Sequence, residues 1–453
     1  MEKVKREGFS SSLVVFFATL SSAVGLGNIW KFPYIVGQNG GATFILIYLL
    51  CVLGVGLPVM LSEFILGRSS KKNVMGAISD VTPRKFFKSV GIFGIIVAFA
   101  ISCFYTAVAG WVYSYIGKAI LGKFRGVDTV QAKEIFDTTT VGPLQPVLWQ
   151  VVVLIVSSII LIKGVRSGIE RVARIGMPIL LGLLIACAVR GLFLEGGKDA
   201  IGYLFIPSFK DISLVSVVMT ALGLAFFKLS LGMGTMMTYA SYFPDDNNLL
   251  GNAVKVIIGD TIVSLLAGMA IFPSVFTFGG EPGSGPGLLF ETIPLIFSKL
   301  PGGNVLIIIF FILAGLAATM ATISMLEVPI AYLSEERKIS RKGAVICTSI
   351  VVAVVGLLAT LSANPQGLLG QKFIFKMTFF NFFDYISSNI LMPIGGLLLA
   401  ILVGYFMKKE RIRHELVEKS GNSVGMMNLY YFILRYITPV LLIIVFLSAL
   451  NII

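Results

Sequence analysis

A lysine lies at the centre of a long apolar segment of this chain. Lys228 follows Phe226-Phe227 and precedes Leu229, within a segment that runs from about residue 214 to 240. Both ends of the segment are about 20 Å away at the rise of an α-helix, so the lysine side chain is too short to reach water. An unpaired charge at that depth in a membrane costs at least ~3 kcal/mol. We therefore expect Lys228 to have a buried partner and a functional role.

The elements that position this lysine are membrane helices. Of the 453 residues, 56% are hydrophobic and 13% are charged, which excludes a water-soluble globule. Apolar runs of about 20 residues recur, and in lipid only helices and closed barrels satisfy their own backbone. We predict an all-α integral membrane protein with about eleven spans: 10–36, 41–67, 89–120, 148–163, 173–195, 214–240, 249–277, 303–334, 343–362, 382–407 and 428–452.

The net charge of +13 is an orientation signal. Basic residues concentrate in alternate loops, such as Lys71-Lys72, Arg341-Lys342 and Lys408-Lys409. Because loops rich in Lys and Arg stay in the cytoplasm, we expect a multi-pass protein of a bacterial inner membrane with a cytoplasmic N-terminus and no nucleic-acid partner. The four cysteines lie in apolar segments and the single histidine in a charged loop, so we expect no disulfide and no metal site.

Two of the predicted spans carry paired glycines at their centres. Gly25 and Gly27 lie in the first span, and Gly232 and Gly234 in the sixth. A single pair is consistent with close helix packing, but two pairs five spans apart indicate broken helices in an inverted repeat. We therefore predict one transmembrane domain over 1–453, with repeats of spans 1–5 (about 9–195) and 6–10 (about 212–407) and an extra helix at about 428–452.

The sequence around these glycines resembles a known family. The run Gly25-Leu26-Gly27-Asn28-Ile29-Trp30-Lys31-Phe32-Pro33-Tyr34 is similar to the first-helix motif of the neurotransmitter:sodium symporters, and Ser230-Leu231-Gly232-Met233-Gly234 to their sixth helix. Segments near Asp260, Pro393 and Pro439 match the seventh, tenth and eleventh helices. With eleven spans, the chain resembles the short bacterial members. The resemblance implies alternating-access uptake of amino acids or amines, with substrate and two sodium ions at the midplane.

The resemblance also implies a substrate site. The Leu26 and Gly27 amides and the Tyr105 hydroxyl would bind a carboxylate, and the Ala23 and Phe227 carbonyls and the Ser230 hydroxyl would hold an amine. Two thioethers in the side-chain pocket suggest an adaptable site, which favours a large apolar or aromatic amino acid. The predicted set is Ser22, Ala23, Leu26, Gly27, Ile101, Tyr105, Phe227, Lys228, Ser230, Met233, Ala321 and Met325.

Two gates follow from the same resemblance. Lys31 and Asp384 would close the outer side, and Arg6 with Glu335 the inner side, with Tyr242 near the latter. Lys31 replaces the usual arginine and loses its bidentate fork. Anchoring at the membrane interface is the alternative role for Lys31 and Asp384.

Lys228 departs from the family pattern. It stands where the family has a Ser or Thr ligand of the first sodium ion, whose other ligands correspond to the Ala23 carbonyl, Asn28 and Asp260. We predict that Lys228 pairs with Asp260, replaces this sodium ion and reaches the substrate carboxylate directly. A purely structural ion pair, without substrate contact, is the alternative.

The second sodium site is predicted to be degraded. Its positions correspond to Ser21, Val24, Ala317, Met320 and Ala321, and a thioether or a methyl group is a poor partner for sodium. A shift of register toward Thr319 or Thr322 would restore a hydroxyl ligand.

These departures lead to a functional prediction with open alternatives. We predict a secondary amino-acid transporter that is sodium-independent or proton-coupled. The alternatives are a conventional sodium-coupled symporter, the only case in which Na⁺ would bind, and a non-transporting membrane sensor. A channel is disfavoured because no repeated filter appears. We expect no enzyme and no cofactor, because no His-containing dyad or clustered nucleophile and base is present. The exact substrate, the coupling ion and the oligomeric state stay open.

Overall fold

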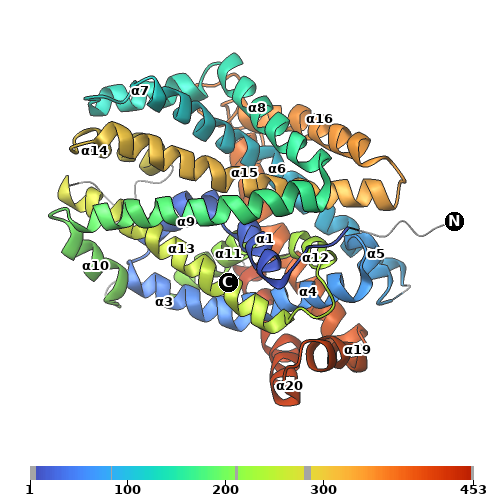
Figure 1. The fold of residues 1–453 in the computed structure, drawn as a ribbon. Helices are drawn as coiled ribbons and strands as arrows, with labels where there is room; N and C mark the ends of the chain where they lie inside the picture. Colours follow the sequence, from blue (N-terminus) through green and yellow to red (C-terminus); the bar gives the residue numbers. More distant parts are fainter. Residues whose placement is uncertain (1–6, 83, 210–212, 280–286, 450–453) are drawn as a thin grey trace.

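A computed structural model describes residues 7–82, 84–209, 213–279 and 287–449 of the chain. Over these ranges the protein is all-α, and the β contacts are limited to one isolated bridge between Ile374 and Met377. In Figure 1 the long helix α9 runs across the molecule, with α6, α8 and α16 on one side of it and α3 and α4 on the other. Helices α1, α11 and α12 lie between these groups.

Within the described residues 7–82 and 84–209, the chain forms ten α-helices and three π-helical turns. They are α1 Ser12–Ala23, η1 Gly27–Lys31, α2 Phe32–Gln38, α3 Ala42–Cys51, η2 Val52–Gly56, α4 Leu57–Ser70, α5 Val74–Ser79, α6 Lys85–Ile120, α7 Thr129–Thr140, α8 Leu144–Ile162, η3 Val165–Glu170, α9 Arg171–Leu192 and α10 Gly197–Phe205.

The second half continues the same pattern. Its elements are α11 Leu214–Lys228, α12 Thr235–Ala240, α13 Leu249–Thr277, η4 Leu288–Thr292, α14 Ile293–Ser298, α15 Gly303–Glu335, α16 Arg341–Thr360, α17 Phe379–Tyr385, η5 Ile386–Leu391, α18 Met392–Ile401, η6 Leu402–Phe406, α19 Lys409–Arg413, η7 His414–Lys419, α20 Val424–Phe432, η8 Ile433–Ile437 and α21 Thr438–Ala449.

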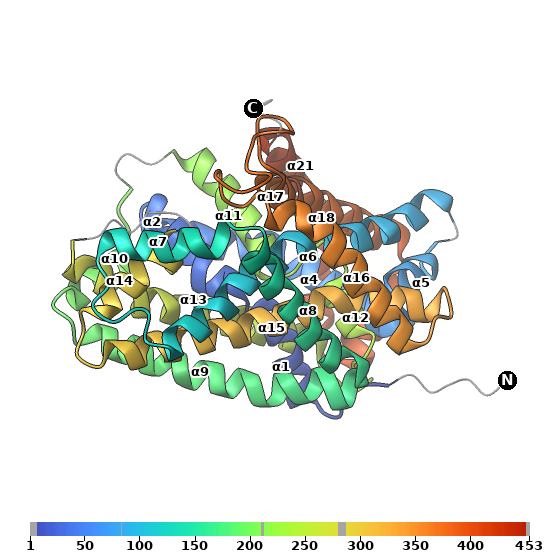
Figure 2. The same ribbon diagram turned by 90° about the horizontal axis from the view of Figure 1, so that it is seen from above.

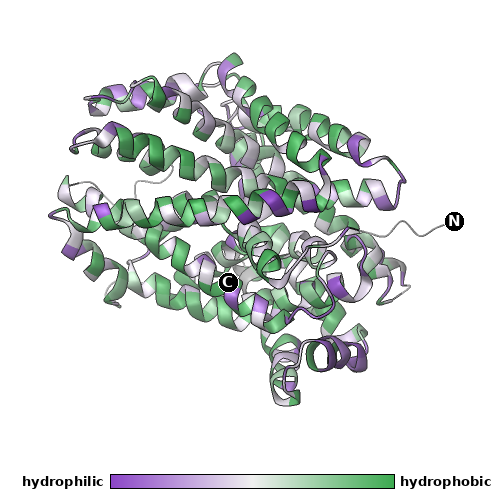
Figure 3. Ribbon diagram, in the orientation of Figure 1, coloured by the Kyte–Doolittle hydropathy of each residue, from purple (hydrophilic) through white to green (hydrophobic). Residues whose placement is uncertain are grey.

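The helices confirm the predicted membrane fold. Within the described ranges, nine helical segments are long and apolar enough to cross a membrane, and the bent pair of α1 with η1 and α2 makes up to ten. The remaining predicted span, 214–240, is divided into α11 and α12, and α11 has only 15 residues. Figure 3 shows apolar residues covering most of the helices and hydrophilic residues gathering toward their ends and on α19.

The sixth span is broken by a short left-handed segment. Ser230, Gly232 and Gly234 have φ angles of 53°, 75° and 75°, a conformation that L side chains rarely adopt. Gly232 also faces α18 so closely that an added Cβ would meet the Met392 carbonyl oxygen and the Gly396 amide. The break therefore depends on glycine for both backbone freedom and space.

Glu63 of α4 stabilises the same break. Its side chain is fully buried, and its two carboxylate oxygens accept hydrogen bonds from Gly232 N at 2.8 Å and Met237 N at 3.1 Å. Amides freed by a broken helix need acceptors because no water is available in the hydrocarbon region. Glu63 supplies them from a neighbouring helix.

The first span bends by 55° between α1 and η1. Helix α1 ends at Ala23, and the next residue, Val24, has an extended conformation. A Cβ placed on Gly25 would lie 2.7 Å from the Tyr105 hydroxyl and 3.0 Å from the Ala321 methyl. The bend thus brings the backbone of α1 against α6 and α15, where only glycine fits.

We expect Gly232→Ala to destabilise the protein by about 2 kcal/mol, because the new methyl group meets backbone atoms of α18 and strains a left-handed position. The measurement is the melting temperature of the detergent-purified protein. Gly182→Ala is the matched control: an added Cβ there meets nothing within 4 Å, so its melting temperature should stay the same or rise. Equal melting temperatures for both variants would contradict the packing argument.

Candidate substrate site and buried ion pair

The two helix breaks, α6 and α15 enclose a pocket with about 330 Å³ of empty space. All predicted substrate-site residues except Leu26 line the pocket, and Gly25 lines it in addition. The lining residues are Ser22, Ala23, Gly25, Gly27, Ile101, Tyr105, Phe227, Lys228, Ser230, Met233, Ala321 and Met325.

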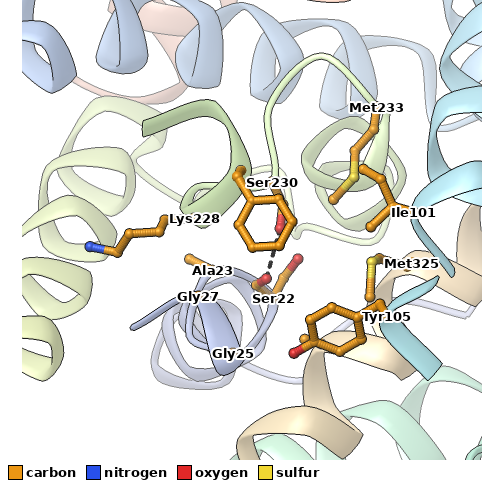
Figure 4. Close-up of a pocket in the computed structure, with 12 residues that line it drawn as sticks. Ser22, Ala23, Gly25, Gly27, Ile101, Tyr105, Lys228, Ser230, Met233 and Met325 are labelled. Carbon is orange, nitrogen blue, oxygen red and sulfur yellow. Dashed lines mark hydrogen bonds between the residues drawn. The ribbon is translucent and has the colours of Figure 1, made fainter. Parts of the chain in front are cut away.

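One side of the pocket is apolar. Figure 4 shows Ile101, Met233 and Met325 along this side, opposite the bend at Ser22 and Ala23. Met233 and Met325 are almost completely buried, so both thioethers contribute their surface to the interior. Because methionine side chains adjust their shape easily, this wall can pack against apolar side chains of different outline.

The polar groups of the pocket lie at the bend of the first span. The amide of Leu26 donates to the Tyr105 hydroxyl at 3.0 Å, and the Ser230 hydroxyl donates to the Ser22 carbonyl at 2.8 Å. The Ser22 hydroxyl is buried and has no hydrogen-bond partner in the described part of the chain. A buried hydroxyl without a partner is costly, and a polar ligand in this pocket would satisfy it.

Lys228 and Asp260 form the centre of a buried polar cluster behind the pocket. Their charged atoms, Nζ and Oδ2, are 3.0 Å apart, and the two side chains are 0% and 1% exposed. Lys228 also donates to the Tyr48 hydroxyl at 3.1 Å, and that hydroxyl lies 3.3 Å from Asp260 Oδ2. The rings of Phe32 and Tyr48 lie 4.3 and 4.6 Å from the ammonium group, which adds cation–π attraction.

Asn28 completes this cluster from η1. Its Nδ2 donates to Asp260 Oδ1 at 2.6 Å and lies 3.0 Å from the Ser264 hydroxyl oxygen. Its amide oxygen accepts the Gly25 N–H at 3.2 Å. Both carboxylate oxygens of Asp260 and the Asn28 oxygen are therefore used within the protein, and the structure brings together the three side chains predicted for this position.

The ammonium group of Lys228 points toward Asp260 and away from the centre of the pocket. Only the stem of Lys228 lies near the pocket, with its Cγ 3.4 Å from where a Cβ on Gly27 would be. Figure 4 shows the amine pointing away from Tyr105 and Met325. In this conformation the ammonium is held on the far side of its stem by Asp260 and Tyr48, and direct contact between Lys228 and a substrate carboxylate stays a prediction.

Of the residues of the predicted second sodium site, Ser21 has a side-chain oxygen, whereas Val24, Ala317, Met320 and Ala321 have none. The Ser21 hydroxyl donates to the Ala18 carbonyl at 2.8 Å within its own helix. The Met320 sulfur packs against Gly176 of α9. Thr319 bonds the Tyr113 hydroxyl of α6 at 2.7 Å, and Thr322 bonds back to the Ala318 carbonyl. Ala317 and Ala321 contribute methyl groups.

The outer pair of gate residues is in contact. Lys31 Nζ lies 2.9 Å from Asp384 Oδ1 and 4.3 Å from the centre of the Phe227 ring. Since Phe227 lines the pocket, this ion pair lies directly beside the substrate site. The side chains are 13% and 35% exposed, so water reaches Asp384 more readily than Lys31.

The structure describes only some of the residues predicted for the inner gate. Arg6 lies outside the described residues. Glu335 accepts hydrogen bonds from the Asn73 amide at 2.8 Å and from the Asn73 side chain at 3.0 Å. Tyr242 donates to Glu327 at 2.7 Å, and Glu327 also accepts two hydrogen bonds from Arg341.

Sequence reasoning missed four residues that hold these groups in place: Tyr48, Glu63, Glu327 and Arg341. Glu63 and Glu327 lie inside apolar spans, so the charge-in-membrane argument applied to Lys228 would have found both. Arg341 directly follows a loop, where a basic residue is expected simply because cytoplasmic loops are rich in Lys and Arg. Tyr48 carries no comparable signal, because tyrosines are common in membrane helices.

The sequence profile of the sodium:neurotransmitter symporter family matches residues 6–126 and 129–453. The chain belongs to this family. An uncharacterised sodium-dependent transporter of Bacillus subtilis, YhdH, is 35% identical over 452 residues, covering 100% of this chain and 99% of that protein. A similar transporter of Methanocaldococcus jannaschii is 28% identical and covers 100% and 92% of the two chains.

Among solved structures of the symporter family, the crystal structure of MhsT in complex with L-phenylalanine has a TM-score of 0.91 to this chain. It is 38% identical and covers 98% of this chain and 100% of MhsT. The likeness extends over the whole symporter fold described above. The protein is therefore a multi-pass membrane transporter of this family.

We expect that removing one partner of the Lys228–Asp260 pair destabilises the protein by ~3–5 kcal/mol, because the other charge stays buried without a partner. The variants are Lys228→Met, Asp260→Asn and the double variant, which should lose less than the sum of the two single losses. Melting temperatures in detergent measure the effect.

The exposed pair Lys72–Asp80, 2.6 Å apart, is the control for this cycle. Lys72→Met and Asp80→Asn should each change stability by less than ~1 kcal/mol. Strictly additive losses at Lys228 and Asp260 would contradict a coupled buried pair.

Proposed function

We propose that this protein is an alternating-access transporter of large apolar or aromatic amino acids in which Lys228 replaces the first sodium ion. The observation that carries the proposal is the contact of Lys228 with Asp260 at 3.0 Å, beside Asn28 and behind the substrate pocket. The resemblance of the sequence to the family assigns a sodium ion to this position. In this chain the cation at that position is the ammonium group of Lys228, which is covalently part of the protein.

The charge balance of the site supports this replacement. Asp260 carries the negative charge, and its two oxygens are engaged by Lys228 and Asn28. The Asn28 oxygen is turned toward the Gly25 amide. A sodium ion bound here would displace these contacts and would lie next to a fixed ammonium group, so both ligand supply and electrostatic repulsion oppose it.

The second sodium position supports the same conclusion. Among Ser21, Met320 and Ala321, only Ser21 has a side-chain oxygen, and its hydroxyl bonds its own helix. The nearby threonines are engaged with Tyr113 and with the backbone of α15. We therefore propose that transport is independent of sodium, with proton coupling or simple exchange as the remaining modes.

The pocket supports an amino-acid substrate. The Tyr105 hydroxyl accepts the Leu26 amide and keeps its own proton to donate to a carboxylate. The Ser22 hydroxyl, buried and free of partners within the described residues, can accept a hydrogen bond from an amine. The neighbouring wall of Ile101, Met233 and Met325 suits an apolar side chain. MhsT, the structural relative, is described in complex with L-phenylalanine.

The proposed transport cycle uses the two halves of the chain. The Lys31–Asp384 contact closes one side of the site in this conformation. We propose that the N-terminus lies in the cytoplasm of an inner membrane and that the inverted repeats rock about the pocket. The relatives YhdH and the Methanocaldococcus protein are named as sodium-dependent, and our proposal departs from them in the coupling ion.

The first test compares ligand-induced thermal stabilisation in NaCl and in choline chloride. We expect L-phenylalanine to raise the melting temperature equally in both salts, because Lys228 supplies the positive charge. Lys228→Ser should make binding depend on Na⁺. If L-phenylalanine stabilised the unmodified protein in NaCl but not in choline chloride, a functional sodium site would be present. That result would contradict the proposal of sodium-independent transport.

Uptake into proteoliposomes separates the transporter from a sensor. Labelled phenylalanine should accumulate or exchange without a sodium gradient. Binding without any movement of label would identify a non-transporting sensor that keeps the symporter fold.

We expect Tyr105→Phe to weaken amino-acid binding at least tenfold, because a hydrogen bond to a charged carboxylate contributes ~1.5–3 kcal/mol. Isothermal calorimetry measures the change. Tyr113→Phe is the matched control, since Tyr113 lies on the same helix but bonds Thr319 instead of lining the pocket. Equal affinities for both variants would remove Tyr105 from the carboxylate site.

A further inference from the structure

An arginine surrounded by three tyrosines lies on the outer side of the helix pair η6 and η8. The guanidinium carbon of Arg435 is 4.7 Å from the ring centre of Tyr405 and 5.8 Å from those of Tyr431 and Tyr436. Tyr405 and Tyr436 are exposed. In a membrane protein such a surface faces lipid or the lipid headgroups. We call these four residues the Arg435 cluster.

The tyrosine hydroxyls hold the Arg435 cluster together. Tyr405 donates to the Arg435 carbonyl at 2.6 Å, and Tyr431 donates to the Gly404 carbonyl at 3.0 Å while accepting from Arg435 Nη1 at 3.3 Å. Tyr405 thus holds the backbone of η8, while the Tyr431 hydroxyl is the one that contacts the guanidinium. Arg435 is not free to move its charge to another place without losing these contacts.

One donor of Arg435 stays unsatisfied. Its Nε–H is buried and has no hydrogen-bond partner among residues 7–82, 84–209, 213–279 and 287–449. A buried, unpaired donor on a charged group is costly. Guanidinium groups commonly bind phosphate and carboxylate through two parallel N–H donors. The covered Nε is not available to an outside ligand, but the guanidinium has no carboxylate partner in the described part of the chain, so an anionic ligand would meet it at its Nη groups.

Further positive charges surround this surface. Lys409 Nζ lies 5.5 Å from the Tyr431 ring centre, and Arg84 lies 5.0 Å from the ring of Phe406. Lys408, Lys409 and Arg84 are all exposed. They mark the place where the span ending at Phe406 leaves the membrane. Figure 1 shows α19 and α20 outside the main bundle here, and Figure 3 shows α19 as strongly hydrophilic.

Apolar side chains continue the surface on the other side. Phe432, Ile437 and Val440, on α20, η8 and α21, are exposed and lie within a span of the membrane. Figure 2 shows α21 projecting beyond one face of the bundle. A ligand that fits both parts has a negative headgroup and a hydrocarbon tail.

We propose that the Arg435 cluster binds the phosphate of an anionic phospholipid, with the Arg435 guanidinium and Lys409 as its two cations. The acyl chains would lie along Phe432, Ile437 and Val440. Basic pockets between membrane helices are known to bind such headgroups.

Native mass spectrometry of the detergent-purified protein tests the proposal by titration with phosphatidylglycerol and with phosphatidylcholine. Phosphatidylglycerol should bind with clear preference. Arg435→Gln should weaken its binding about tenfold, and Lys409→Gln about fivefold. Lys409 is exposed, so that variant should fold even if Arg435→Gln does not.

Arg174→Gln, an exposed arginine of α9, is the matched control and should bind phosphatidylglycerol like the unmodified protein. Equal binding of phosphatidylglycerol by the Lys409 and Arg174 variants would overturn the proposal. Displacement of the lipid by inorganic phosphate at a matching concentration would overturn it too, since the cluster would then recognise phosphate from solution. The readout is independent of amino-acid transport.

Discussion

The ion pair between Lys228 and Asp260 joins the elements on which the rest of the site depends. It connects the end of α11 with the middle of α13, and through Tyr48 and Asn28 it extends to α3 and η1. In an apolar interior neither charge is tolerated alone, so the four elements are held in one relative arrangement. The substrate pocket lies immediately beside this cluster, so the cluster also fixes the positions of the helices that line the pocket. A mobile sodium ion would tie the same elements together only while bound, whereas Lys228 is covalently attached to α11.

The broken helices impose a second constraint, because every freed backbone group needs a partner. Glu63 accepts two amides of the sixth-span break, and Tyr105 accepts the Leu26 amide at the first. These acceptors come from α4 and α6, outside the broken spans. Helices α4 and α6 thus determine where the first and sixth spans can bend, although neither helix is itself broken. Gly25 and Gly232 let the bent backbone pack closely against its neighbours.

The charged contacts around the pocket differ in their exposure to water and in their hydrogen-bond partners. Lys31 and Asp384 are partly exposed, so water can replace their contact when the outer side opens. Lys228 and Asp260 are buried and fully partnered, which suits a permanent element better than a gate. Arg435 is different again, with a covered donor on the lipid-facing surface. Our proposals for the coupling ion and for a bound phospholipid follow from these differences in exposure and partnering.

The sequence by itself determined the membrane class, both helix breaks and most of the pocket. Length and apolarity define spans, glycine pairs define breaks, and the depth of Lys228 required a buried partner. Only the tertiary structure decided where side chains point. The bend places Gly25 rather than Leu26 at the pocket, and the Lys228 amine turns toward Asp260 and away from the substrate site. Local patterns cannot give these directions, because they depend on how two broken helices rotate against α3, α6 and α13. The role of Tyr48 was hidden for the same reason: its hydroxyl matters only because folding brings two distant charges to it.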